Sequence, residues 1–154
     1  GAKRAKHYHG LFPDSGLAIG DKTKNSDYAV LEKKIEKIEI VGDVQRRIVI
    51  SVDDLIASGG SMVNLAETAK EKGAIGFYCA VAHGLFVGNA EEKFTKSYED
   101  GLVDRVLCTD SVHHTGEFLE RNKLWLTEIS IAGLLAKTIK ALHDDEPISE
   151  IYGN

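Results

Sequence analysis

The sequence predicts an α/β domain with an open, mainly parallel sheet and flanking helices. Short β-branched runs alternate with helical stretches, and this alternation is typical of parallel strands joined by right-handed crossovers. The run AIGFYCAVA at 74–82 is apolar throughout, as expected of a strand covered on both faces. The 154 residues suffice for one domain with a hydrophobic core.

Composition and periodicity place the elements in order. The N-terminal part should hold a short helix, a buried strand and two β-branched strands, over 2–9, 16–20, 38–42 and 47–52. A polar, lysine-rich stretch over 21–37 interrupts them. The rest alternates helices, at 61–73, 89–99 and 131–143, with strands, at 74–82, 103–109 and 124–130.

Charge and hydropathy argue against two classes of partner. With 19 Lys and Arg against 24 Asp and Glu, the net charge of -5 disfavours a broad nucleic-acid surface. No apolar run approaches the roughly 18 residues that cross a bilayer, so no membrane partner is expected. Cys79 and Cys108 are isolated, without C-x-x-C spacing. They indicate neither a metal site nor a disulfide framework, and hence a reducing, cytoplasmic setting.

The most informative stretch is VISVDDLIASGGSM at 49–62, where two carboxylates end an apolar strand and a small-residue loop precedes a helix. Ligands of open α/β sheets bind beyond the carboxyl ends of strands. Main-chain N–H groups of 57–61 at a helix N-terminus suit a phosphate, and Ser58 and Ser61 add hydroxyl donors. Asp53 and Asp54 suit sugar hydroxyls, directly or through Mg²⁺. Together these groups predict a phosphoribosyl site.

Other interpretations of this loop are weaker or purely structural. A Walker A loop needs Gly-Lys-Ser/Thr, but Gly60 is followed by Ser61. The structural alternative is a strand that ends in a tight turn, with the aspartates acting as a helix cap.

The segment VDDLIASGGSM resembles the phosphoribosyl-pyrophosphate motif of type I phosphoribosyltransferases. Further segments resemble, in order, ribose-phosphate pyrophosphokinases (phosphoribosyl-pyrophosphate synthetases): GAKRAKHYH, VGDVQRRIVISVDD, AVAHGLFVGNA and VDRVLCTDSV. The tail ISIAGLLAKTIKALHDDEPISEIYG is similar to the family's closing segment. The resemblance implies a single type I phosphoribosyltransferase-like (Rossmann-like) domain over 1–154, forming the C-terminal half of a longer two-domain protein.

The resemblance also implies an activity. These enzymes use Mg²⁺ and transfer the diphosphoryl group of ATP to ribose 5-phosphate, giving phosphoribosyl pyrophosphate and AMP for nucleotide biosynthesis. They generally form homo-oligomers, and this half alone should be inactive without the ATP-binding half. By position, Asp53 and Asp54 would hold the ribose hydroxyls. The 5-phosphate would be held by Ala57, Ser58, Gly59, Gly60 and Ser61.

Lys22 and Lys24, in GDKTKNSD, resemble the Lys-x-Arg motif of the family's catalytic loop, with Lys24 where arginine is usual. A cation closing over the site would neutralise charge on the transferred phosphoryl oxygens, although lysine lacks the bidentate grip of arginine. Lys33 and Lys34 are a second placement of the loop lysine. Simple solvation of an exposed loop is the structural alternative.

Two other functions fit the same residues. An adenine-type phosphoribosyltransferase would share the loop and act on a base. A non-catalytic regulatory subunit would keep the fold, and it is favoured by Lys24 and by Ala57, where many synthetases carry an aspartate.

Several residues follow other strand ends. His83 is a candidate for the edge of the site, with a structural histidine as the alternative. By analogy with the family, residues 109–111 (Thr-Asp-Ser) are candidates to line it, whereas His113 and His114 are expected in a surface loop.

Overall fold

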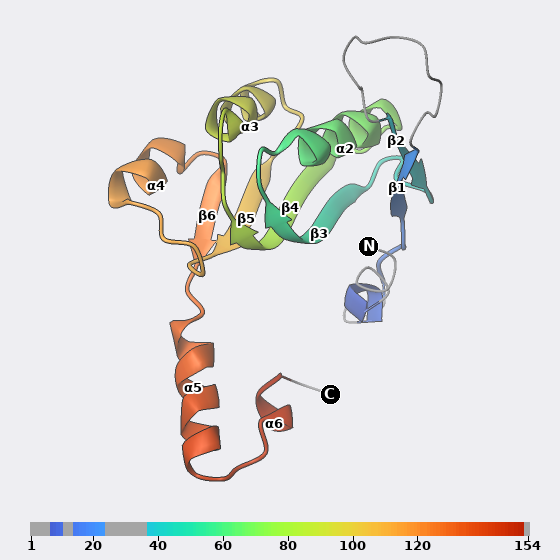
Figure 1. Ribbon diagram of the computed structural model, residues 1–154. Helices are drawn as coiled ribbons and strands as arrows, with labels where there is room; N and C mark the ends of the chain where they lie inside the picture. Colours follow the sequence, from blue (N-terminus) through green and yellow to red (C-terminus); the bar gives the residue numbers. More distant parts are fainter. Residues whose placement is uncertain (1–6, 11–13, 24–36, 153–154) are drawn as a thin grey trace.

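The computed structural model describes residues 7–10, 14–23 and 37–152. Their main sheet is four-stranded and parallel in the order β3-β4-β5-β6, with strands Ile48–Ile56, Gly76–Gly84, Arg105–Thr109 and Leu126–Ile129 (Figure 1). A separate antiparallel pair is formed by β1 (Ile19–Thr23) and β2 (Lys37–Val41). The predicted α/β class with a mainly parallel sheet is confirmed.

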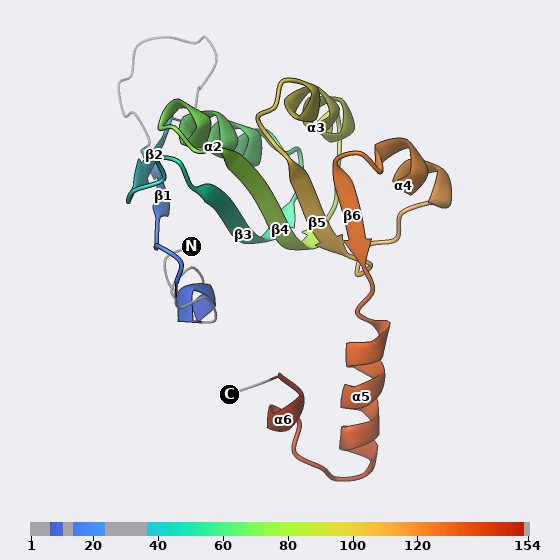
Figure 2. The ribbon, with the colours of Figure 1, turned by 180° about the vertical axis from the view of Figure 1, so that it is seen from behind.

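The helices alternate with the parallel strands. Helices α2 (Gly60–Glu71) and α3 (Ala90–Glu99) lie over one face of the sheet, and α4 (Gly116–Asn122) lies beside β6 (Figures 1 and 2). Helices α5 (Ala132–His143) and α6 (Ser149–Tyr152) project from the carboxyl end of the sheet. Residues 7–10 are helical, so this helix overlaps the one predicted at 2–9 and includes Gly10, which was expected to end it.

The core lies between the sheet and α2 and α3. Alternate residues of the two central strands are buried, namely Phe77, Cys79, Val81, Val106 and Cys108. The period of two follows from the pleat of a strand. The helices contribute buried residues at helical spacing, including Met62, Ala66, Ala69, Ala90 and Phe94. Trp125 stacks on Phe94 with ring centroids 5.3 Å apart, and so closes the core at β6.

Strand boundaries differ most from the prediction at β1 and β3, where pairing outweighs local composition. The strand predicted at 16–20 begins only at Ile19, and it continues into the polar stretch to Thr23 because β2 pairs with it along that length. The strand predicted to stop at 52 runs to Ile56, since its register with β4 continues from Ile48–Gly76 to Ile56–Gly84. Asp53 and Asp54 therefore lie within β3 and not beyond its end.

Two short helices, α4 and α6, escaped prediction. The sequence of α4, GEFLERN, has only two large apolar residues and thus little periodicity. Its start is fixed by Thr115, whose hydroxyl accepts a hydrogen bond of 3.2 Å from the N–H of Phe118. The segment before α4 also corrects the expectation for His114, because its side chain is only 7% exposed and so does not lie in a surface loop.

Some apolar side chains remain uncovered. On β3, Ile48 and Ile50 are 59% and 61% exposed, and on α5 the exposed large side chains include Leu135, Ile139 and Leu142. The helix predicted at 131–143 is thus formed, but within the described residues its apolar face is largely unburied. None of the helices in the described ranges has the length and apolar character to cross a membrane.

Candidate phosphoribosyl site

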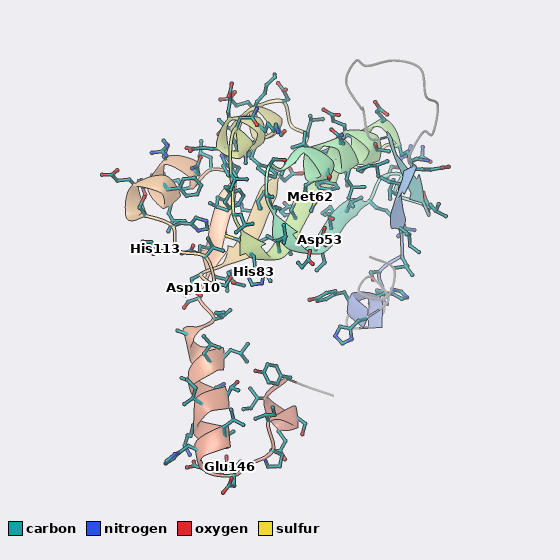
Figure 3. All side chains as sticks on the ribbon, in the orientation of Figure 1. Asp53, Met62, His83, Asp110, His113 and Glu146 are labelled. Carbon is teal, nitrogen blue, oxygen red and sulfur yellow. The ribbon has the colours of Figure 1, made fainter. Side chains whose placement is uncertain are left out.

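The two carboxylates lie near the carboxyl end of β3 and are exposed. Asp53 accepts a hydrogen bond of 2.9 Å from the N–H of Asp54, and Asp54 accepts one of 2.9 Å from the N–H of Leu55. Figure 3 shows Asp53 at the edge of the sheet from which α5 also projects. The backbone therefore fixes both side chains at the edge where ligands of parallel sheets bind.

The turn between β3 and α2 depends on a glycine. Gly59 is the N-cap of α2 with a φ of 75°, in the left-handed region. A Cβ on Gly59 would lie 2.6 Å from Cε2 of Phe94, so the turn approaches α3 more closely than any side chain would allow. Gly60 differs, since a Cβ there would meet nothing within 4 Å. Gly59 thus allows the turn to pack closely against Phe94, whereas the space beside Gly60 is open.

Neighbouring segments hold the turn in place. The N–H of Leu85 donates to the carbonyl of Ile56 at 2.8 Å, and that of Val87 to the carbonyl of Ala57 at 3.0 Å. The ammonium group of Lys93 in α3 donates to the carbonyl of Ser58 at 3.1 Å. The loop is therefore preorganised by contacts from far along the chain. Sequence reasoning missed Lys93 because no local pattern links it to a loop 35 residues away.

The start of α2 is suited to an anion. The N–H groups at the start of a helix have no carbonyl of a preceding helical turn to bind. In α2, the N–H groups of Met62 and Val63 both donate to the carbonyl of Gly59, and the groups before them lie at the start of the helix. The first turn of α2 carries no acidic residue, whereas that of α3 carries Glu91 and Glu92. The positive end of the α2 dipole is thus not compensated by a side chain of its own first turn.

The adjoining strand ends are joined by a network of hydroxyl groups. Thr109 donates to the carbonyl of Ala82 at 2.6 Å, and Ser111 lies 3.0 Å from the same carbonyl. The Nδ1 atom of His83 lies 2.8 Å from the hydroxyl of Ser111. Figure 3 shows His83 and Asp110 along the same edge of the sheet as Asp53. The structure thus brings these candidates to one edge, while their contact with a ligand stays a prediction.

Asp110 has a structural role as well. Its carboxylate accepts hydrogen bonds from the N–H of Ile131, at 2.9 Å, and from the hydroxyl of Ser130. These hydrogen bonds, first that from Ile131, hold the pKa of Asp110 below its usual range. The charged side chain joins the end of β5 to the start of α5.

The predicted catalytic lysines are only partly within the described chain. Lys22 lies in β1, where its backbone is paired opposite Ile38. Lys24, like the alternative Lys33 and Lys34, lies outside the described residues. The catalytic role of Lys22 and Lys24 stays a prediction.

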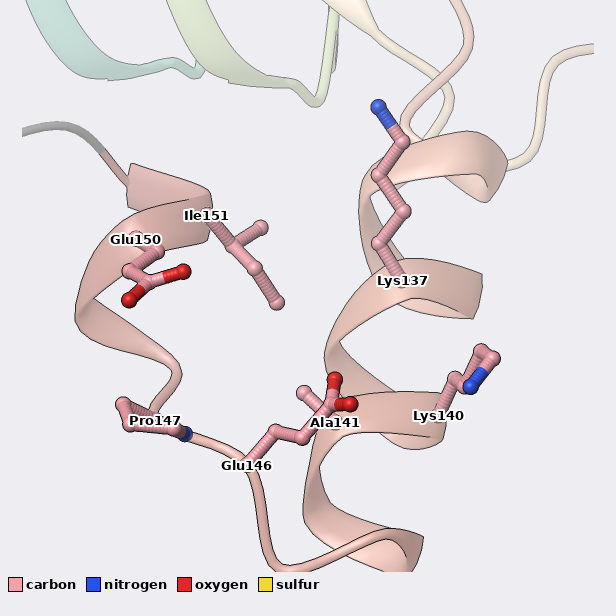
Figure 4. Close-up of a pocket in the computed structure, with 7 residues that line it drawn as sticks. All are labelled: Lys137, Lys140, Ala141, Glu146, Pro147, Glu150 and Ile151. Carbon is pink, nitrogen blue, oxygen red and sulfur yellow. The ribbon is translucent and has the colours of Figure 1, made fainter.

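A separate hollow of about 480 Å³ lies between α5 and α6 (Figure 4). Glu146 lies between the two helices, whereas Lys140 points away from α6 and Lys137 points toward the sheet. The ammonium groups do not converge there, so the hollow does not suit a phosphate. The start of α2 therefore stays the predicted anion site.

The family model described as phosphoribosyl synthetase-associated domain matches residues 19–153. The chain belongs to this family. The predicted resemblance is thereby confirmed, and it extends over most of the chain.

Known relatives agree with the family match. A ribose-phosphate pyrophosphokinase of Shewanella oneidensis is 34% identical over 154 residues, covering 100% of this chain and 45% of the relative. That of Rhodopirellula baltica is 34% identical over 136 residues, covering 88% of this chain and 40% of the relative. The crystal structure of phosphoribosylpyrophosphate synthetase from Mycobacterium smegmatis matches with a TM-score of 0.74 and 26% identity, covering 93% of this chain and 42% of that chain. The chain thus spans less than half the length of these relatives.

Proposed function

We propose that this chain is the ribose-5-phosphate-binding half of a ribose-phosphate diphosphokinase, a transferase of nucleotide biosynthesis. One arrangement supports the proposal above all. The paired carboxylates of β3 lead directly into a preorganised glycine turn at the start of α2, in a chain of the phosphoribosyl synthetase-associated family. Acceptors for a sugar next to donors for an anion match the two ends of ribose 5-phosphate.

Each group has a defined part in this proposal. Asp53 and Asp54 accept hydrogen bonds from the ribose hydroxyls. The 5-phosphate lies against the start of α2, where main-chain N–H groups of Ala57 to Ser61, the hydroxyls of Ser58 and Ser61 and the helix dipole favour its charge. The open space beside Gly60 lets the phosphate approach the backbone.

Mg²⁺ fits the same residues. Asp53 and Asp54 are exposed carboxylates at the end of β3, and carboxylate oxygens are the ligands that Mg²⁺ prefers. When bound, the ion neutralises negative charge on the diphosphoryl group. Asp53 and Asp54 would hold the ion beside the sugar that they bind.

ATP would be bound by the other half of a longer two-domain protein, with this chain as the C-terminal half. The exposed apolar residues of α5 and β3 support an adjoining domain or subunit, because contact with it would remove them from water. Lys22 and Lys24 would contribute positive charge to the transferred phosphoryl group. We further infer a homo-oligomer in the cytoplasm, consistent with the two free, buried thiols.

Two measurements test the proposal. The full-length protein should form AMP from ATP and ribose 5-phosphate in the presence of Mg²⁺, and it should not consume phosphoribosyl pyrophosphate with adenine. In the chain itself, ribose 5-phosphate with Mg²⁺ should shift the amide NMR signals of residues 57–61. Adenine-dependent consumption would favour the phosphoribosyltransferase, while amide shifts without either reaction would favour the regulatory subunit. Unchanged loop amides would refute the binding site itself.

A further inference from the structure

Three potential metal ligands from separate segments meet at the helix-covered face of the sheet. Cys108 in β5 and Glu128 in β6 are direct neighbours in the parallel register, and His114 lies just before α4. The Sγ of Cys108, a ring nitrogen of His114 and a carboxylate oxygen of Glu128 all lie within 4.8 Å of one another. Cys108 is 1% exposed, and the His114 and Glu128 side chains are 7% and 20% exposed. The cluster is therefore largely shielded from water.

The hydrogen bonds of His114 direct its Nδ1 atom at Glu128. Its Nε2 atom lies 2.8 Å from the carbonyl oxygen of Gly84, which can only accept, so Nε2 carries a hydrogen. Its Nδ1 atom lies 2.6 Å from Oε2 of Glu128. In the metal-free protein this short contact is a hydrogen bond. Both atoms are also metal ligands, so a cation that takes the place of the shared hydrogen would be bound by both once they move apart.

The surroundings hold the imidazole in one orientation. The ring of Phe118 stacks on it with centroids 5.1 Å apart, and that of Phe86 lies at 5.6 Å. The hydrogen bond from Nε2 to a backbone carbonyl is the arrangement usual for a histidine that binds a metal through its other nitrogen. Nδ1 is thus directed at Glu128.

We propose that Cys108, His114 and Glu128 bind one Zn²⁺ ion, with water as the fourth ligand. Thiolate, imidazole and carboxylate are all ligands that Zn²⁺ takes in tetrahedral sites. Ligand atoms of such a site lie roughly 3.3–3.8 Å apart, so small side-chain shifts complete it from the present geometry. The site is not the proposed Mg²⁺ site, because its strand residues lie in β5 and β6, separated from β3 by β4, and it offers sulfur and nitrogen.

Proton balance follows from the ligand chemistry. Burial, and to a lesser extent the charge of Glu128, raises the pKa of Cys108 to about 11, so the thiol is protonated at neutral pH without the ion. On binding, the S–H bond breaks, its electron pair forms the Zn–S bond and the proton goes to solvent. The proton between His114 and Glu128 is displaced in the same way. No atom changes oxidation state, and two protons are released per ion.

The isolated spacing of the cysteines predicted no metal site, because a motif such as C-x-x-C reveals only ligands that are close in sequence. Here the ligands are 6 and 14 residues apart and meet through strand pairing and a loop. Cys79, equally buried in β4, is not part of this group and provides a matched control.

The site can be tested on the purified protein, freed of metal with a chelator and titrated with Co²⁺ as a spectroscopic substitute for Zn²⁺. We expect one ion per chain, a near-ultraviolet thiolate-to-cobalt charge-transfer band and the visible bands of tetrahedral cobalt. Zn²⁺ should displace Co²⁺. Added to the metal-free protein, Zn²⁺ should release two protons per ion and raise Tm, since a ligand of the folded state stabilises it. Absence of the charge-transfer band in the wild-type protein would overturn the proposal and leave a His–Glu ion pair.

Variants locate the ion. Cys108→Ser should abolish the charge-transfer band, and His114→Ala should weaken Zn²⁺ binding by at least about tenfold. Cys79→Ser should keep both the band and the affinity. A band that survives in Cys108→Ser, or that is lost equally in Cys79→Ser, would contradict the assignment. None of these readouts involves ribose 5-phosphate, so their failure leaves the proposed function untouched.

Discussion

The ring of Phe94 occupies the space beside Gly59, where a Cβ would lie only 2.6 Å from its Cε2 atom. Gly59 also has a φ of 75°, which other residues adopt at a cost. The turn that begins α2 thus packs directly against Phe94 of α3, whereas a Cβ on the adjacent Gly60 would meet no atom within 4 Å. The two glycines of the loop should therefore respond differently to the same substitution.

Gly59→Ala should lower the free energy of unfolding by about 2 kcal/mol, because the methyl group meets both a disfavoured φ and the Phe94 ring. Urea denaturation measures this change. Gly60→Ala is the matched control and should alter stability by less than about 1 kcal/mol, since alanine suits a helix and finds no clash. Equal losses in the two variants would contradict this account of the turn.

Gly60→Ala should instead weaken binding of ribose 5-phosphate by at least about tenfold, or about 1.4 kcal/mol, because its methyl group occupies the approach to the backbone N–H groups. Isothermal titration calorimetry in the presence of Mg²⁺ gives the affinity. Gly133→Ala, also in open space but in α5, should leave the affinity unchanged. Full affinity in Gly60→Ala would place the phosphate elsewhere.

Asp53→Asn and Asp54→Asn should each reduce Mg²⁺-dependent binding of ribose 5-phosphate by about tenfold or more, without loss of stability. An asparagine oxygen can still accept the hydrogen bond from the following N–H, so the local backbone is preserved while the charge is removed. Asp43→Asn provides the control, because Asp43 is also exposed and accepts a backbone hydrogen bond, from Gln45. Binding without Mg²⁺ dependence in the wild-type protein would count against this role for the aspartates.

The sequence predicted the alternation of parallel strands with helices, and the glycine turn before α2, because both are local patterns. The alternation of buried residues along the strands, and the helical spacing of Met62, Ala66 and Ala69, can be read directly from the sequence. The extension of β3 through Asp53 and Asp54 could not be predicted from the sequence, because it depends on the register with β4. Pairing across a sheet is a tertiary property that two exposed acids do not reveal.

Long-range contacts account for the remaining differences at the candidate site. Lys93 reaches Ser58 from α3, and His114 is buried by Phe86 and Phe118. Neither residue carries a local signal of its role. Two adjacent histidines among polar residues predict a surface loop from sequence alone. In the structure His114 instead lies beside Glu128, because β6 brings that residue close.

Asp104 should matter for stability because it directly precedes β5 and accepts a hydrogen bond of 2.7 Å from the N–H of Phe77. Its own N–H donates to the carbonyl of Phe77 at 2.8 Å, so the starts of β4 and β5 are joined twice. Asp104→Ala should lower the free energy of unfolding by about 1–3 kcal/mol, since the Phe77 N–H loses its acceptor. Asp104→Asn, which keeps an acceptor oxygen, should lose less in the same urea titration. An equal loss in both would assign the effect to charge, through Lys70 at 3.6 Å, and not to the hydrogen bond.

The two buried thiols should make the protein less stable in alkali. Burial raises the pKa of Cys79 to about 12 and, together with Glu128, that of Cys108 to about 11, whereas an unfolded chain ionises its thiols near about 8.5. Above that pH the unfolded state loses protons that the folded state keeps, so the free energy of unfolding falls as pH rises toward 11. Each thiol adds up to about 1.4 kcal/mol of loss per pH unit. Urea titrations from pH 8 to about 10.5, with a chelator present, should therefore show a shallower decline for Cys79→Ser than for the wild type. Identical slopes would mean that Cys79 ionises as readily in the folded protein as in the unfolded chain, in conflict with its position beneath α2 and α3.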